Sequence, residues 1–270
     1  MQYGLVDTHC HLQSTRFLPD LGVLVEEARA NGVDDMIVCA GSREDWRECR
    51  RIAHEHDLAY TLGIHPFYTP HAREEDLERL RAVCTEALED PHFVGVGEIG
   101  LDHLVDIDPE LQEFYFAGQL RIARDLGLPC SIHNRKSEDR ILKYLNRFPV
   151  SGVVHAFNGS EVFRTRLTEL GLKMGFGGAL TYEGSRRIRA HIQSLGMTHW
   201  VLETDAPDMP NSERRVRGDL RTEPSDLADT AMLVAELIDR PFADVVRQSR
   251  VNAYEAFPRL ALRHPLGVGE

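Results

Sequence analysis

The stretch that decides the fold is GLVDTHCH, residues 4–11, close to the start of the chain. Its first half is a short apolar run of the kind that forms a buried β-strand. A dinucleotide-binding sheet would carry a glycine-rich turn after this first strand, but two histidines, His9 and His11, stand there instead. Residues two apart on a strand point to the same side. We therefore expect His9 and His11 to face one end of a sheet, placed to share a metal ion, although an isolated pair of this kind is also typical of an ordinary polar strand end.

Strand-like and helix-like segments alternate along the rest of the chain. The expected strands, short and rich in β-branched residues, are residues 4–9, 35–40, 59–63, 93–97, 129–133, 152–155, 172–177 and 200–204. The expected helices between and after them are residues 23–31, 44–56, 74–89, 110–126, 137–147, 162–170, 185–195 and 225–238. Strict strand–helix order predicts parallel crossovers.

This order predicts an α/β fold, a TIM-type (β/α)8 barrel, with an open doubly wound sheet as the main rival. A further helical segment, 242–262, is expected as an extra C-terminal helix that packs against the outside of the barrel. No linker rich in proline, glycine or serine divides the chain, so we expect a single domain over residues 1–270.

Composition and charge limit the class of protein. The chain has 270 residues, 42% hydrophobic and 27% charged, and five scattered cysteines without a CxxC pair. The lack of a disulfide pattern, a signal sequence and a long apolar run predicts a cytoplasmic protein without a membrane span. The net charge of −12 argues against a broad basic surface that grips long duplex DNA. Nothing in the sequence indicates an obligate protein partner.

Residues able to bind a metal ion recur at the ends of the expected strands. The candidates are His9, His11, Glu98, His133, His155 and Asp205. Each alone is compatible with an ordinary polar strand end, but together they would converge on the C-terminal face, where barrel active sites lie. Imidazoles and carboxylates without a thiolate suit Zn²⁺, Mn²⁺, Ni²⁺ or Fe²⁺, and Mg²⁺ less well. Six ligands predict two divalent ions about 3.5–4 Å apart, with Glu98 as the bridge.

Further polar residues flank these candidates. Asp205 is a candidate for proton transfer as well as metal binding. Glu203 lies two residues earlier and is either a partner that holds a histidine ligand or an ordinary strand-end charge. Arg135 and Lys136 directly follow His133 and are placed to meet a phosphate. The arginine-rich segment 211–221 is either a basic lip over the site or a solvated loop.

Several ordered motifs carry a family resemblance. They are VDTHCHL (6–12), GIHP (63–66), VGVGEIGLD (94–102), SIHNR (131–135), GVVHAFNGS (152–160), LETDAPDMP (202–210), TEPSDL (222–227) and VNAYEAF (251–257). Over nearly its whole length the chain resembles the TatD family of metal-dependent deoxyribonucleases, within the amidohydrolase superfamily. GGALTYEGS (177–185), together with TDAPDMP, is similar to the YjjV-like branch of that family.

The resemblance implies roles for single residues. It implies one metal ion on His9, His11, Glu98 and Asp205, and a second on Glu98, His133 and His155. It also implies that His65 contacts the scissile phosphate, although a histidine beside a proline turn has an ordinary structural explanation too. Asn134 and Asn158 stand where the family frequently has serine. These two changes spare the ligands but are expected to alter phosphate contacts or substrate choice.

Together these features predict a metal-dependent hydrolase that cleaves a phosphodiester, most simply a TatD-type deoxyribonuclease with exonuclease action. The expected substrate is a nucleic-acid end or a small phosphodiester. One alternative is an amidohydrolase that cleaves a C–N bond of a small cyclic amide or base. A carboxylated lysine commonly bridges such centres, whereas this sequence has Glu98 there. The non-enzymatic alternative is a binding protein with an inactive metal site.

Overall fold

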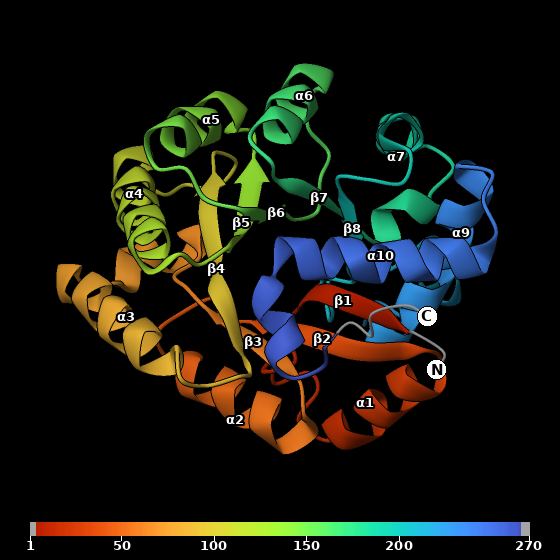
Figure 1. The fold of residues 1–270 in the computed structure, drawn as a ribbon, viewed down its shortest axis with the longest axis horizontal. Helices are drawn as coiled ribbons and strands as arrows, with labels where there is room; N and C mark the ends of the chain where they lie inside the picture. The colour runs from red at the N-terminus through yellow and green to blue at the C-terminus, as the bar shows by residue number, and fades with distance from the viewer. Residues whose placement is uncertain (1–3, 266–270) are drawn as a thin grey trace.

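A barrel of eight parallel strands forms the centre of the computed structural model, which describes residues 4–265 (Figure 1). The strands pair in chain order and are β1 (Leu5–Cys10), β2 (Val33–Cys39), β3 (Ala59–Leu62), β4 (Phe93–Asp102), β5 (Cys130–Arg135), β6 (Gly152–Val154), β7 (Lys173–Phe176) and β8 (Trp200–Leu202). Backbone hydrogen bonds from Asp205 N to His9 O (2.9 Å) and from His11 N to Ala206 O (2.7 Å) join the two ends of the sheet. The predicted (β/α)8 barrel is confirmed.

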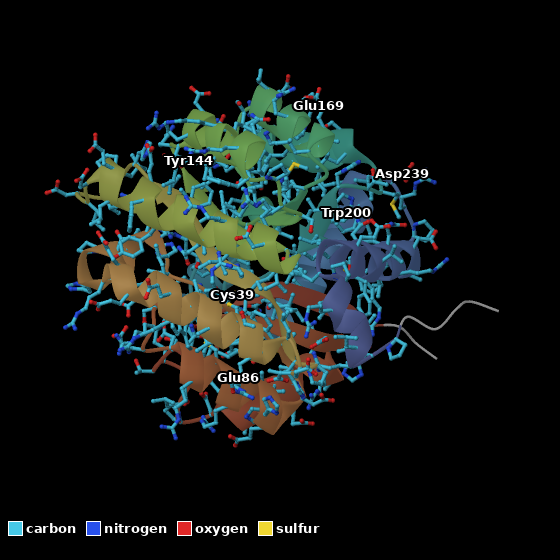
Figure 2. The ribbon with its side chains drawn as sticks, turned by 60° about the vertical axis from the view of Figure 1, so that its left-hand side comes forward. Cys39, Glu86, Tyr144, Glu169, Trp200 and Asp239 are labelled. Atoms are coloured by element: carbon cyan, nitrogen blue, oxygen red, sulfur yellow. The ribbon has the colours of Figure 1, made fainter. Side chains whose placement is uncertain are left out.

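Helices cover the outside of the strands (Figure 2). The α-helices are α1 (Leu21–Ala30), α2 (Trp46–His56), α3 (Glu74–Ala87), α4 (Pro109–Leu126), α5 (Glu138–Arg147), α6 (Glu161–Glu169), α7 (Arg186–Leu195), α8 (Ser212–Arg217), α9 (Leu227–Leu237) and α10 (Phe242–Ala256). The 3₁₀ helices within residues 4–265 are η1 (Pro66–His71), η2 (Gly178–Thr181), η3 (Pro224–Asp226) and η4 (Pro258–Leu262). Among residues 4–265, no helix is both long and apolar enough to cross a membrane.

The extra C-terminal helix lies where the sequence-based prediction did not put it. One buried cluster contains Tyr254 of α10, Phe257 just after it and Leu260 of η4, together with strand residues such as Val6 and Val201. Figure 1 shows α10 running across the middle of the barrel. The helix therefore contributes to closing one end of the barrel, and the prediction that it packs against the outside is wrong. Pro258 ends it before residue 262, because proline cannot continue a helix.

A short helix occupies part of the segment predicted as a loop. Helix α8 begins after Asn211, whose side chain accepts a hydrogen bond from Arg214 N (2.9 Å). It ends at Gly218, which adopts the left-handed conformation common at helix ends. Both capping residues are visible in the sequence, but the helix they bound has no buried residue and therefore no apolar periodicity to reveal it.

Glycines allow β4 to approach its neighbours beside Glu98. A Cβ added to Gly63 would lie 2.7 Å from the backbone oxygen of Glu98, and one added to Gly97 would lie 2.7 Å from the Cβ of Ser131. Gly100 has a φ of +145°, and a Cβ there would lie 2.0 Å from the backbone oxygen of His133. The glycine-rich stretch 94–100 thus brings strands β3, β4 and β5 together at the end that carries the polar cluster.

Gly127 is a comparison for Gly100 that lacks the close approach of a neighbouring strand. Gly127 also has a positive φ (+66°), but a Cβ there would meet nothing within 4 Å. We expect Gly127→Ala to lower the free energy of unfolding by about 1 kcal/mol through backbone strain alone. Gly100→Ala adds a collision with a fixed carbonyl and should lower it by several times as much. Urea unfolding measures both, and equal losses would show that the strand approach is not tight.

Candidate metal centre

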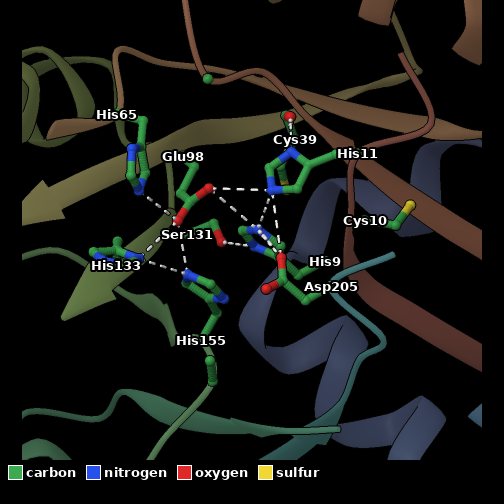
Figure 3. Close-up of polar contacts among 12 residues, drawn as sticks. His9, Cys10, His11, Cys39, His65, Glu98, Ser131, His133, His155 and Asp205 are labelled. Atoms are coloured by element: carbon green, nitrogen blue, oxygen red, sulfur yellow. Dashed lines mark hydrogen bonds and ion pairs between the residues drawn. The ribbon is translucent and has the colours of Figure 1, made fainter. Parts of the chain in front are cut away.

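A cluster of imidazoles and carboxylates lies at the C-terminal ends of the strands (Figure 3). All six metal-binding candidates predicted from the sequence meet there, together with His65, which follows β3. They come from β1 (His9, and His11 just after it), β4 (Glu98), β5 (His133) and the turns after β6 (His155) and β8 (Asp205). Barrel enzymes build their active sites on this face.

Glu98 lies at the centre of the cluster and is almost completely buried. Its Oε2 faces His9 Nε2 (3.4 Å) and His11 Nε2 (3.3 Å), and its Oε1 faces His65 Nε2 (3.3 Å), His133 Nδ1 (3.1 Å) and His155 Nε2 (2.7 Å). The two carboxylate oxygens therefore point to two different groups of imidazoles. This is the arrangement that a carboxylate needs to offer one oxygen to each of two cations.

Three groups of side chains in the cluster are close enough together to hold a metal ion. They are His9–His11–Asp205, His9–Glu98–His155 and His65–Glu98–His133. The first group contains three of the four ligands predicted for one ion and lacks Glu98. The other two share Glu98 and differ from the predicted Glu98–His133–His155 set by including His9 or His65. His133 Nδ1 and His155 Nε2 are nevertheless only 3.3 Å apart.

Hydrogen bonds fix which ring nitrogen of two histidines faces the cluster. Nδ1 of His11 lies 2.9 Å from the backbone oxygen of Cys39, and Nε2 of His133 lies 3.1 Å from Asp102 Oδ2. Because a carbonyl and an ionised carboxylate only accept, both nitrogens carry the proton. The opposite nitrogen of each ring faces Glu98 and, in the neutral ring, carries the lone pair that a metal ion would take. The donor set of the cluster therefore fits a divalent cation.

His65 differs from these two histidines. Its Nδ1 accepts a hydrogen bond from Phe67 N (3.1 Å), so the proton of the neutral ring is on Nε2, which faces Glu98. Burial lowers the pKa of His65 and favours this neutral form. With a proton on the nitrogen that points inward, His65 is oriented as a hydrogen-bond donor rather than as a ligand.

The protonation of the carboxylates suits a cation site. Burial by itself raises the pKa of Glu98, but nearby imidazoles, chiefly His65 and His155, hold it well below the ordinary value. Burial likewise raises the pKa of Asp205, and the hydrogen bond from His11 and the neighbouring imidazoles lower it. Both carboxylates are thus ionised at neutral pH.

His9 is the most deeply buried of the histidines in the cluster. Its Nδ1 lies 2.8 Å from Ser131 Oγ, which anchors the ring from behind. Burial, followed by repulsion from His155, lowers the pKa of His9 to about 4. The ring is therefore neutral at physiological pH and has a lone pair for a metal ion.

Glu203 was predicted as a partner that holds a histidine ligand, and the contact is looser than expected. Its Oε1 lies 3.8 Å from His155 Nδ1, too far for a hydrogen bond, and accepts a hydrogen bond from Ala156 N instead. His155 Nδ1 and Glu203 Oε2 are buried and have no hydrogen-bond partner among the described residues. Burial raises the pKa of Glu203 to about 8. A Cβ on Gly175 would lie 2.0 Å from Glu203 Oε2, so this glycine makes room for the acid.

An open cavity of about 910 Å³ leads to the cluster, and its lining includes Arg135, Lys136 and Asn134. Arg135 and Lys136 are exposed at its mouth. The side chain of Asn134 is held by a hydrogen bond within the protein, which its Oδ1 accepts from Ser137 Oγ (2.8 Å).

The arginines of segment 211–221 do not form a basic lip over this cavity. Arg214 forms ion pairs with Asp219, Glu223 and Asp226, and Arg221 forms ion pairs with Asp20 and Glu223. The cavity wall includes none of the arginines of this segment. The positive charge of Arg214 and Arg221 is therefore compensated within the protein.

Asp102 is the main residue of the site that the sequence analysis missed. It is fully buried, holds His133 through Oδ2, and accepts a hydrogen bond from Leu104 N (2.8 Å) through Oδ1. The sequence does indicate this residue, because Glu98 and Asp102 are four residues apart on one strand and therefore point to the same side.

A barrel whose strand ends carry such a cluster defines the class of metal-dependent hydrolases built on the (β/α)8 fold. The chain belongs to the TatD-related DNase family, whose model matches residues 6–258. The metal-dependent hydrolase YjjV of Escherichia coli is 33% identical over 259 residues, 93% of this chain and 97% of YjjV. The crystal structure of YjjV, described as a TatD homolog, gives a TM-score of 0.89 at 31% identity and covers 96% of this chain and 99% of its own.

A second relative carries the name of an activity. The 3′-5′ ssDNA/RNA exonuclease TatD of Erwinia tasmaniensis is 28% identical over 261 residues, 94% of this chain and 99% of its own. These similarities confirm the resemblance to the TatD family inferred from the motifs.

Asp102 can be tested as a positioning residue for His133. We expect Asp102→Ala to weaken the binding of Zn²⁺ or Mn²⁺ to metal-stripped protein by about 10–100-fold, because the ring loses the partner that orients it. Asp102→Asn keeps an acceptor oxygen and should restore part of the affinity. Isothermal titration calorimetry measures both, with the exposed Asp106→Ala as the matched control. If Asp102→Ala bound metal as tightly as this control, the positioning role would be refuted.

Proposed function

We propose that this protein is a divalent-metal-dependent phosphodiesterase that removes nucleotides from the end of a nucleic-acid strand. The observation that carries the proposal is the division of imidazoles between the two oxygens of buried Glu98. A carboxylate in this arrangement suits a pair of metal ions, which is typical of enzymes that hydrolyse phosphodiesters. The exonuclease named among the relatives supports the choice of substrate.

Two metal ions are proposed, held by the residues predicted from the sequence. His9, His11, Asp205 and Glu98 would bind one, and Glu98, His133 and His155 the other. Four imidazoles favour Zn²⁺, Mn²⁺ or Ni²⁺ over Mg²⁺. When bound, such ions supply a water of lowered pKa and compensate charge on the non-bridging phosphate oxygens.

The chain's own residues would orient the phosphate and move the proton. His65, with its proton on the inward-facing Nε2, is placed to donate a hydrogen bond to a phosphate oxygen near Glu98. Asp205 is ionised and points its Oδ1 at His9 and His11, which leaves Oδ2 to accept a proton from the attacking water. His65 and Asp205 thus take complementary roles as donor and acceptor.

The mouth of the cavity suits an unpaired strand. Phe67 and Tyr68 line it and are 44% and 45% exposed, so their rings are accessible to a ligand. Bases of single strands stack on such rings, and cations such as Arg135 and Lys136 meet the phosphates. The net charge of −12 opposes extended contact with a duplex, which again favours a strand end.

The test uses metal-stripped enzyme and a 5′-labelled single-stranded oligonucleotide, with Mg²⁺, Mn²⁺, Zn²⁺ or Ni²⁺ added back separately. We expect stepwise shortening that depends on metal. Glu98→Gln should slow it by at least about 10²–10³-fold, because the bridging charge is lost. The exposed Glu78→Gln is the matched control and should cleave normally.

One outcome would redirect the proposal. If ions bind but no metal supports cleavage, while dihydrouracil or hydantoin is hydrolysed, the enzyme acts on C–N bonds and the phosphodiesterase proposal is wrong.

The aromatic rim gives a separate prediction. Tyr68→Ala should raise KM for the oligonucleotide by about 5–150-fold and leave kcat unchanged, since one stacking contact contributes about 1–3 kcal/mol to binding. The matched control is Phe114→Ala, an equally exposed aromatic (45%) on α4 that is not part of the cavity wall. Steady-state kinetics with single-stranded oligonucleotides measure KM and kcat of both variants. An unchanged KM for Tyr68→Ala would exclude a stacking role.

A further inference from the structure

A second cavity, of about 540 Å³, lies outside the barrel between α2 and α3. Its wall comprises Arg43, Trp46, Arg47, Arg50, Tyr60, Leu62, Arg79, Ala82, Val83, Glu86 and Ala87, and so none of the proposed metal-binding residues. Glu86, labelled in Figure 2, marks α3 on this side of the ring of helices. The cavity is therefore separate from the metal centre.

The floor of this cavity is apolar and offers no free polar group. Trp46 and Tyr60 carry its polar atoms, and both are already satisfied within the protein. Trp46 Nε1 donates a hydrogen bond to Gly63 O (2.9 Å), and Tyr60 OH donates one to Asp90 Oδ2 (2.9 Å). The rest of the floor is aliphatic, from residues such as Leu62 and Val83. A ligand seated here would have to bury an apolar body, because a polar edge would lose its hydrogen bonds to water without replacement.

The rim, in contrast, carries four arginines. Arg43 is paired with Asp76 (2.9 Å), and Arg50 lies 3.3 Å from Asp90. Arg47 and Arg79 are exposed, and neither forms an ion pair or hydrogen bond with another side chain in residues 4–265. Two exposed guanidinium groups thus lie over an apolar cavity, and the one carboxylate of its wall, Glu86, lies 3.8 Å from Arg50.

We propose that this cavity binds a small organic anion, with an aromatic or aliphatic body against Trp46 and Val83 and an acidic head group between Arg47 and Arg79. The volume is within the range of small-molecule sites, about 300–1,000 Å³. Guanidinium groups bind carboxylate, sulfonate or phosphate oxygens through charge-assisted hydrogen bonds. The floor excludes a nucleobase, whose edges need hydrogen-bond partners. The site is thus independent of the proposed nuclease function.

The probe is 8-anilinonaphthalene-1-sulfonate, titrated into metal-free protein and followed by fluorescence. We expect one saturable site. The double variant Arg47→Gln/Arg79→Gln should weaken its binding at least about tenfold, because both contacts to the sulfonate are lost. The affinity of the same variant for the neutral analogue N-phenyl-1-naphthylamine should fall less than twofold. Val83→Glu, which places a charge on the apolar floor, should reduce the binding of both probes.

Arg135→Gln is the matched control, since Arg135 is an exposed arginine at the other cavity. Loss of binding in this control, with none in the double variant, would overturn the proposal. Competition identifies the class of ligand: 4-phenylbutyrate should displace the probe, and adenosine monophosphate should not. Equal displacement by the nucleotide, or displacement by an acidic peptide but not by 4-phenylbutyrate, would also overturn it. None of these outcomes depends on catalysis, so failure here leaves the proposed nuclease function standing.

Discussion

A buried carboxylate, Glu98, is the constraint on which the site depends. An ionised acid removed from water is costly unless opposite charges and hydrogen-bond donors surround it. Five imidazoles supply that environment. They come from the ends of four strands, β1, β3, β5 and β6, so the barrel must place each strand end correctly for the acid to remain charged. The rings are held in turn by Asp102, Ser131 and the Cys39 carbonyl. Positioning is thus distributed over neighbouring strands rather than assigned to one loop.

The two ends of the barrel differ in composition and role. The C-terminal end carries the polar cluster and an open cavity, and glycines at positions such as 97 and 100 let the strands approach there. The interior and the other end form an apolar cluster with α10 and η4, through residues such as Phe257 and Leu260. This separation is usual for barrel enzymes, in which chemistry lies at one face and stability at the other. It leaves the polar end free to change substrate without loss of the core.

The barrel and the six metal-binding candidates could be predicted from the sequence because both follow from simple geometry. Parallel strands end at one face, and side chains two apart on a strand share a side. Contacts between side chains that are far apart in the sequence could not be predicted. The pattern of 242–262 shows that one face is apolar, but not that this face meets the barrel interior. Glu203 lies beside His155 as expected, yet its carboxylate accepts a hydrogen bond from the backbone N–H of Ala156 and not from the His155 ring. Asp102 was overlooked because an acid at a strand end is common, and only its distance to His133 singles it out.

Glu98 is proposed to bridge two cations. The most direct measurement is a crystal structure of protein loaded with Mn²⁺ or Zn²⁺, with anomalous diffraction recorded at the absorption edge of the metal. We expect two anomalous peaks about 3.5–4 Å apart, one on each side of the Glu98 carboxylate, with the first beside His9 and His11 and the second beside His133 and His155. A single peak, or two peaks that do not share Glu98, would contradict it.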